Sequence, residues 1–282
     1  MKKGTPSLVF CSLACAFFLP SFALADSETE PDQTIPLPIL TYHYVESLED
    51  ATRRAAALIT SPVVFEKQLL ALQERGYQTV FVRDIPSRLV SPLRSFPAIA
   101  LTFDDGYEDF YWNVLPLLRK YRMKTTLYVV PGFIGKTGYL SEEELRAIND
   151  TGLVEIGAHT LHHKNLPRLS TAAATQEIRG GKEELEQKFG ITVSSFAYPF
   201  GAHTPRIEKI VEGAGFTAAV TTDRGWDQSP SRLYTLRRIP GLVFLGSRKW
   251  KAIGEPAAPS VTSSASSTAS PSARPNHRRS TR

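Results

Sequence analysis

The sequence has very little cysteine: only Cys11 and Cys15 occur in its 282 residues. Both lie in an apolar amino-terminal segment that we expect to be removed, so we expect a mature chain without disulfides. Long apolar runs are missing after that segment, because no later stretch approaches 18 consecutive apolar residues, and this excludes a transmembrane helix. The chain must therefore be stabilised by its own hydrophobic core, which a single domain of roughly 200 residues can provide.

The sequence also lacks a basic region that would suit nucleic acid. The formal net charge is +5, but two of the positive charges are Lys2 and Lys3. Residues 254–282 hold four arginines against the single acid Glu255, so the region between the two ends is close to neutral. We therefore expect no nucleic-acid partner, and no feature of the sequence indicates an obligate protein partner.

The amino-terminal segment resembles a secretory signal peptide. Lys2 and Lys3 precede an apolar run from Leu8 to Leu19, and Ala23-Leu24-Ala25 forms a small-x-small cleavage site. A lipoprotein signal would use Cys15, but Ser12 stands where a branched apolar residue is expected. We expect export to the periplasm or the extracellular space. The predicted organisation is a signal peptide (1–25), a short linker (26–35), one domain (36–250) and a disordered tail rich in Ser, Ala and Pro (254–282).

Between the two ends, short apolar runs alternate with amphipathic segments. This alternation predicts parallel β/α units, and seven or eight strands predict a barrel-like closure. Chemistry in such barrels gathers where the strands end. The predicted strands cover residues 39–42, 79–82, 98–103, 125–130, 154–158, 195–198, 218–221 and 236–239. The predicted helices cover residues 62–75, 84–89, 109–121, 141–150, 171–189 and 205–214.

Two adjacent carboxylates follow the apolar run at residues 98–103. Asp104 and Asp105 would repel each other, so a site that holds both needs a cation or a shared proton. The alternative interpretation is an Asp-Asp-Gly turn whose aspartates cap the helix that begins near Tyr107.

Three of the six histidines occur within five positions after the run at residues 154–158. On a helical turn, His159 and His163 are spaced so that both imidazoles can bind one ion, while His162 points elsewhere; alone, the group is also compatible with a surface histidine cluster. Together with Asp105 they make a three-ligand site with open positions, the pattern of a catalytic zinc site. Asp104 is then left as the general base. Zinc is the default ion, and cobalt, nickel or manganese suit the same ligands.

These two stretches resemble the first two motifs of the NodB-homology polysaccharide deacetylases, carbohydrate esterase family 4. The matching residues are Thr102-Phe103-Asp104-Asp105-Gly106 and His159-Thr160-Leu161-His162-His163. The resemblance covers roughly residues 36–245 and implies an α/β fold, a distorted (β/α)7 barrel. It also implies that Asp104 is the catalytic base and that Asp105, His159 and His163 bind the metal.

The later motifs depart from the family pattern. In Ala197-Tyr198-Pro199-Phe200-Gly201, alanine replaces the family's arginine, so Arg237 or Arg238 would have to supply that charge. The resemblance assigns the Tyr198 backbone amide to the oxyanion, and it places Pro199, Asp223 and Trp226 at the substrate pocket.

The fifth motif should bring a histidine as general acid, but the late strand at residues 236–239 contains none. His43, at the end of the first predicted strand, is the remaining candidate, and the alternative is that it only shapes the pocket. This combination of motifs is most similar to deacetylases of poly-N-acetylglucosamine.

The resemblance implies a metal-dependent hydrolase that removes N-acetyl groups from an N-acetylglucosamine polysaccharide, whether of the poly-N-acetylglucosamine, peptidoglycan or chitin type. Two alternatives stay open: an O-acetyl polysaccharide esterase, and a secreted carbohydrate-binding protein without catalysis. The aromatic residues Tyr111, Trp112, Phe133 and Tyr139 are candidates for lining a glycan groove or, for the first two, for packing in the core.

Overall fold

The structure is a computed structural model that describes Met1 and residues 34–47, 49, 56–91, 96–248 and 250. The predicted signal peptide and tail lie outside the described residues, as does most of the predicted linker. Ile35, the last residue of that linker, already belongs to a short strand and is buried. Within the described part of the chain, no helix is both long and apolar enough to cross a membrane.

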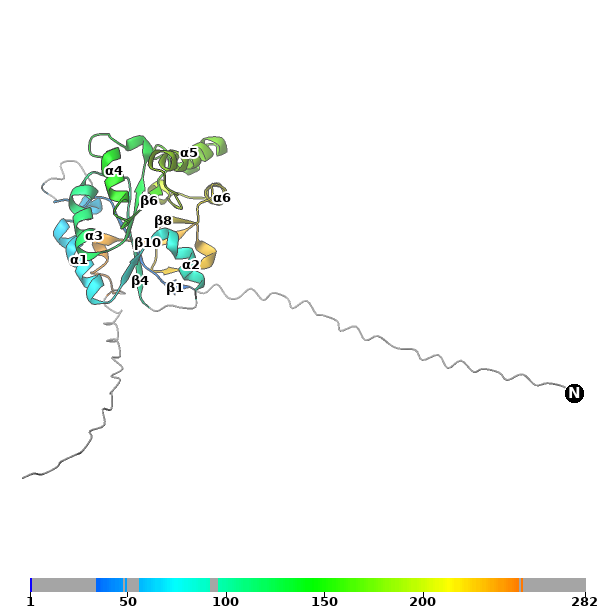
Figure 1. The fold of residues 1–282 in the computed structure, drawn as a ribbon, viewed down its shortest axis with the longest axis horizontal. Helices are drawn as coiled ribbons and strands as arrows, with labels where there is room; N and C mark the ends of the chain where they lie inside the picture. The colour runs from blue at the N-terminus through cyan, green and yellow to red at the C-terminus, as the bar shows by residue number, and fades with distance from the viewer. Residues whose placement is uncertain (2–33, 48, 50–55, 92–95, 249, 251–282) are drawn as a thin grey trace, which may run out of the picture.

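Seven parallel strands close into a barrel, with the helices arranged around them (Figure 1). Closure occurs where the first barrel strand pairs with the second, so the predicted (β/α)7 barrel is confirmed. Every residue from Ala98 to Phe103 is buried, as expected for a parallel strand covered on both faces. The barrel strands are β2 (Ile39–Tyr42), β4 (Ala98–Phe103), β5 (Thr125–Val129), β6 (Val154–Ala158), β7 (Ser195–Ala197), β8 (Ala218–Arg224) and β10 (Leu236–Pro240).

Three short strands of the described residues lie outside this ring. β3 (Gln78–Val80) pairs with the first half of β4, and β5 pairs with its second half, which makes the barrel irregular. β1 (Ile35–Pro36) and β9 (Asp227–Gln228) form a two-residue antiparallel ribbon. The sequence did not predict this ribbon, because two residues are too few to show an alternating pattern.

The helices begin and end at the polar and glycine signals that the sequence contains. Ser141 and Glu144 form a capping box at the start of one helix, and Gly190 ends another in the left-handed conformation. The α-helices are α1 (Pro62–Glu74), α2 (Ile85–Val90), α3 (Leu115–Tyr121), α4 (Glu142–Asn149), α5 (Thr171–Phe189) and α6 (Pro205–Gly213).

The predicted helix at residues 109–121 is not continuous. A π-helical turn, η3 (Phe110–Val114), precedes α3, and the amide of Leu115 donates to the carbonyl of Phe110, five residues back. Pro116 explains the change, because it has no N–H with which to continue the regular α-helical hydrogen bonds.

The hydrophobic core has two layers. The outer layer packs between strands and helices, and the inner layer fills the barrel around Tyr128. Gly157 on β6 makes room for the Tyr128 ring, since a Cβ at residue 157 would lie 2.5 Å from a ring carbon. The lumen is therefore filled below the carboxyl ends of the strands, and this packing supports the groups at those ends.

Candidate active site

Two neighbouring carboxylates end β4 and turn in different directions. Asp105 has a φ of 75°, in the left-handed region, and Gly106 follows with a φ of 77°. The chain reverses sharply here, so Asp104 and Asp105 reach different partners. The capping interpretation is not supported, because neither side chain caps the turn that begins at Phe110.

Asp104 forms a buried ion pair with Arg238 of β10. Two guanidinium nitrogens donate to the two carboxylate oxygens, each at 2.8 Å, and Arg238 is only 2% exposed. The same guanidinium also donates to the Thr221 carbonyl oxygen at 2.7 Å and to Thr102 Oγ1 at 3.2 Å. Arg238, rather than Arg237, therefore supplies the charge that the third motif lacks.

The ion pair controls the protonation of Asp104. Burial alone would raise the pKa of this carboxyl, but the charge and hydrogen bonds of Arg238 outweigh that effect and hold the pKa below its ordinary value. Asp104 is therefore a carboxylate at neutral pH and keeps free lone pairs, as a general base requires.

Asp105, His159 and His163 bring one ligand atom each to a common point. Asp105 Oδ1 lies 3.4 Å from His159 Nε2 and 3.3 Å from His163 Nε2. The three ligand atoms all lie within 4.8 Å of one another. His159 Nδ1 lies 2.7 Å from the Ala197 carbonyl oxygen, and a proton on Nδ1 leaves the Nε2 lone pair facing the cluster.

This cluster suits a divalent cation. Asp105 Oδ1 is buried and accepts no hydrogen bond from any described residue. Burial would raise the pKa of Asp105, but His159 and then His43 and His163 lower it well below its usual range. A buried carboxylate oxygen without a hydrogen-bond donor and the two imidazole nitrogens that it faces make up a ligand set that zinc and similar ions bind.

The histidines converge without a helical turn, which corrects the predicted geometry. His159 directly follows β6, and the next residues form a tight turn in which Thr160 and His163 have φ values of 62° and 57°. Gly181 of α5 allows this turn, because a Cβ there would lie 2.7 Å from the Thr160 carbonyl carbon. His162 faces away from the cluster, as predicted, and the structure shows that it pairs with Glu177 at 3.0 Å.

The amide of Tyr198 is not available to an oxyanion, contrary to the prediction. It donates to the Val220 carbonyl oxygen at 3.2 Å as part of the contact between β7 and β8. The amide of Phe200, two residues later, has no acceptor among the described residues. Phe200 has a φ of 60° and its ring lies 4.7 Å from that of His163, so its amide is the better candidate.

Pro199 and Gly201 hold Phe200 in this position. Both are buried in the short 3-10 turn η6 (Pro199–Gly201), and Gly201 has a φ of 66°. The Pro-Phe-Gly sequence was the available signal for an unusual backbone at Phe200, since proline and glycine mark tight turns.

His43, which follows the first barrel strand, β2, lies beside the ion pair. It lines a pocket of about 190 Å³ together with Thr41, Thr222 and Arg238. It is also close enough to Asp104 and Asp105 to lower the pKa of both.

Trp226 and Asp223 lie outside the lining of the pocket beside His43, and their place at the substrate pocket stays a prediction. The Trp226 ring stacks on Phe244 at 5.5 Å, and neither predicted residue is among the described residues that line the pocket beside His43. The Asp223 carboxylate is exposed and lies 3.5 Å from His203 Nε2. Both residues belong to the segment after the buried part of β8, which begins with exposed residues and leads to the β1–β9 ribbon.

The barrel and the groups at its carboxyl end are typical of a hydrolytic (β/α) barrel, with a buried carboxylate–arginine pair beside an Asp-His-His cluster. The polysaccharide deacetylase family model matches residues 94–219. "Putative polysaccharide deacetylase YxkH" of Bacillus subtilis is 30% identical over 210 residues, covering 73% of this chain and 72% of that protein. The chain belongs to the polysaccharide deacetylase family, and the predicted hydrolase class is confirmed.

One structural and one sequence comparison agree with this family. The Streptococcus pyogenes deacetylase PplD, solved in complex with acetate, superposes with a TM-score of 0.66 at 26% identity, covering 74% of this chain and 92% of that one. The poly-beta-1,6-N-acetyl-D-glucosamine N-deacetylase of Staphylococcus aureus (strain N315) is 28% identical over 155 residues. The match covers 50% of this chain, which spans about half (53%) of that relative's length.

Proposed function

We propose that this protein removes N-acetyl groups from an N-acetylglucosamine polysaccharide and releases acetate. The arrangement that carries the proposal is the Asp104–Arg238 ion pair placed beside the cluster of Asp105, His159 and His163. The Staphylococcus aureus relative, which carries the name of a poly-beta-1,6-N-acetyl-D-glucosamine N-deacetylase, supports the choice of a poly-N-acetylglucosamine substrate.

Asp105, His159 and His163 would hold one divalent ion, with Zn²⁺ as the first candidate and Co²⁺, Ni²⁺ or Mn²⁺ as substitutes. Such an ion supplies Lewis acidity, which draws charge from an acyl oxygen and makes water easier to deprotonate.

Different groups around the cluster accept and donate the protons of the reaction. Asp104 takes a proton from the attacking water, and Arg238 keeps Asp104 deprotonated beforehand. The oxygen of water adds to the amide carbon, and the Phe200 amide donates to the oxyanion that forms. The C–N bond then breaks and the departing nitrogen takes a proton from His43, which lies on the Arg238 side of the site.

The substrate's acetyl group would enter the pocket beside His43. This pocket of about 190 Å³ is small, and it borders both His43 and Arg238. Thr41 Oγ1 is buried at its wall and has no hydrogen-bond partner among the described residues, so it is free to contact a bound acetamide.

Acetate release tests the proposal. Zinc-loaded protein should release acetate from β-1,6-linked N-acetylglucosamine oligomers, and a chelator should stop the release. Acetate from O-acetylated xylan but from no N-acetylated oligomer would replace the proposal with a polysaccharide esterase. Binding of the oligomers without release of acetate from either substrate would favour a binding protein.

We also propose that the domain is exported by residues 1–25 and functions outside the cytoplasm. The Lys2-Lys3 pair, the apolar run and Ala23-Leu24-Ala25 support this step. Amino-terminal sequencing of the exported protein should begin near Asp26, and retention of Met1 in the mature protein would contradict it.

A further inference from the structure

The pocket beside His43 is lined by two kinds of side chain. The polar ones include the His43 ring, the buried guanidinium of Arg238 and Thr41, whose Oγ1 is buried without a hydrogen-bond partner among the described residues. The apolar ones include Leu58 and Leu242, which we call the leucine pair. An occupant that suits this lining has one end that can hydrogen-bond and one end that is apolar.

The leucine pair is partly open to solvent. Leu58 is 39% exposed and Leu242 is 46% exposed. The two residues come from distant parts of the sequence, the short turns η1 (Ala56–Leu58) and η8 (Gly241–Val243), yet they border the same pocket. Single exposed leucines need no explanation. A pair of them beside buried polar groups at a pocket indicates a surface that a ligand covers.

Hydrogen bonds hold both leucines in place before any ligand binds. The amide of Tyr44 donates to the carbonyl oxygen of Leu58 at 3.1 Å. The side-chain amide of Gln68 donates at 2.6 Å to the carbonyl oxygen of Gly241, the residue before Leu242. Because a preformed pocket loses little entropy on binding, contacts with the leucine pair can contribute to affinity.

The pocket is larger than an acetyl group needs. Its volume is about 190 Å³, and an engineered cavity of about 150 Å³ holds benzene, with its six carbon atoms. By the same proportion, the pocket has room for about eight non-hydrogen atoms, whereas a complete N-acetylglucosamine unit has about fifteen. An acetyl group has only two carbons and one oxygen. The volume therefore suits an acyl chain that is longer than acetyl.

We propose that the pocket beside His43 accepts N-acyl groups longer than acetyl, so that the protein also hydrolyses N-propionyl and N-butyryl glucosamine units. This inference rests on the proposed function and extends its substrate class. The acyl carbonyl lies at the polar groups and the alkyl chain lies over the leucine pair. The oxygen of water adds to the amide carbon while Asp104 takes the proton, and the C–N bond breaks. The chain leaves as propionate or butyrate, and the nitrogen leaves as an amine with a proton from His43.

The first test compares acyl lengths on one enzyme. Zinc-loaded protein would be given β-1,6-linked glucosamine oligomers that carry N-acetyl, N-propionyl or N-butyryl groups, and the released carboxylate would be measured. We expect kcat/KM for the butyryl oligomer to lie within about threefold of the acetyl value, because the added methylenes are buried against apolar side chains. A pocket shaped for acetyl alone would lower kcat/KM about tenfold to 100-fold, since overfilling a packed site is unfavourable.

Variants that fill the pocket sharpen this test. Leu58→Trp and Leu242→Trp should each lower the ratio of butyryl to acetyl kcat/KM at least about tenfold. This ratio does not depend on how much of a variant is folded. Leu70→Trp is the matched control, because Leu70 is 38% exposed on α1 but is not among the described residues that line the pocket. Its ratio should equal that of the parent. An unchanged ratio in both filling variants, or a parent that releases acetate but no butyrate, would overturn the inference and leave the proposed function intact.

Binding without turnover distinguishes the failure of the two proposals. In an Asp104→Asn background, calorimetry should show that the butyryl oligomer binds about threefold to tenfold more tightly than the acetyl oligomer. Leu242→Trp should remove this preference. Such a preference, without release of any carboxylate when Asp104 is intact, would contradict the proposed function and retain only the acyl-binding pocket. Equal or weaker binding of the butyryl oligomer would overturn the inference, whether or not acetate is released.

Discussion

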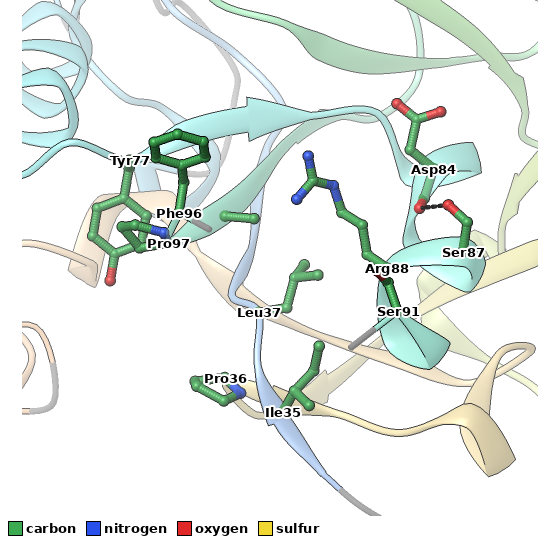
Figure 2. Close-up of a pocket in the computed structure, with 11 residues that line it drawn as sticks. Ile35, Pro36, Leu37, Tyr77, Asp84, Ser87, Arg88, Ser91, Phe96 and Pro97 are labelled. Atoms are coloured by element: carbon green, nitrogen blue, oxygen red, sulfur yellow. Dashed lines mark hydrogen bonds between the residues drawn. The ribbon is translucent and has the colours of Figure 1, made fainter. Parts of the chain in front are cut away.

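The two ends of the barrel differ in what they contain. At the amino ends of the strands lies a pocket of about 790 Å³, lined largely by apolar side chains such as Ile35, Leu37 and Phe96 (Figure 2). At the carboxyl ends, the pocket beside His43 measures only about 190 Å³. The smaller pocket borders the buried ion pair and the Asp-His-His cluster, so donor groups rather than volume identify the site.

Buried carboxyl groups behave differently at the two ends. Glu155, near the start of β6, accepts hydrogen bonds from Thr126 and Ser195 at 2.8 Å each, but burial dominates and raises its pKa. Asp104, after the end of β4, has an arginine partner that lowers its pKa. Burial stabilises a neutral acid at one end, and a fixed cation stabilises a carboxylate at the other.

Backbone strain also differs between the two ends of the barrel. Among the described residues other than glycine, five have a positive φ, and four of them are Asp105, Thr160, His163 and Phe200. The fifth, Arg122, ends α3 as an ordinary left-handed cap. The strained positions therefore gather at the carboxyl end, where the ligand atoms and the free amide are oriented.

The largest effect is expected from breaking the ion pair. Arg238→Met leaves Asp104 buried and unpaired, so the free energy of unfolding should fall by about 3–5 kcal/mol in a urea titration. Because the pKa of Asp104 should rise, the acid limb of the activity profile should move to higher pH. Arg238→Lys, which restores a charge, should recover part of both effects, and an unchanged pH profile in Arg238→Met would contradict this role.

The next effect concerns metal affinity. Loss of an outer partner of a metal ligand typically weakens binding 10–100-fold, so loss of a ligand itself in His163→Ala should weaken zinc binding by at least about 100-fold. His162→Ala is the matched control, because His162 lies in the same turn but pairs with Glu177. Equal zinc affinity in the two variants, measured by calorimetry, would remove His163 from the cluster.

A smaller effect is expected from Glu155. A carboxyl whose pKa is raised on folding binds more protons in the folded state, so stability should fall as the pH rises from the unfolded value through the folded one. Glu155→Gln cannot ionise, and its unfolding free energy should lack this fall. Thermal or urea unfolding across the range above pH 4.5 measures it, and identical pH dependence in parent and variant would show that folding does not raise the pKa of Glu155.

The smallest effect is expected at the large amino-end pocket. Arg88→Ala changes a charged residue that lines this pocket (Figure 2) and should leave acetate release within twofold of the parent, since surface changes away from special features are usually minor. A marked loss of acetate release would show that the amino-end pocket contributes to activity, which contradicts the difference drawn here between the two ends of the barrel.

Much of the fold and part of the site could be predicted from the sequence. Apolar runs and caps located the barrel strands and α-helices, because their signals are local. The sharp reversal at Asp105 and the turn at Thr160 and His163 were not predictable, since non-glycine residues rarely take positive φ values and tertiary contacts hold them there. The choice of Arg238 over Arg237 depends on which face of β10 points inward at a bulged register. Motif similarity assigned the oxyanion to the Tyr198 amide, but that amide is used in strand pairing, and the free amide belongs to Phe200. A motif carries no information about strand pairing, so the sequence could not show this difference.

The central claim is that Asp104, held as a carboxylate by Arg238, is the base of a deacetylation at the carboxyl end of the barrel. The most direct measurement is acetate release from N-acetylglucosamine oligomers by zinc-loaded parent, Asp104→Asn and His162→Ala. We expect Asp104→Asn to lose about 100- to 10,000-fold in rate while it still binds zinc, and His162→Ala to match the parent. Release by Asp104→Asn at the rate of the parent would contradict the account.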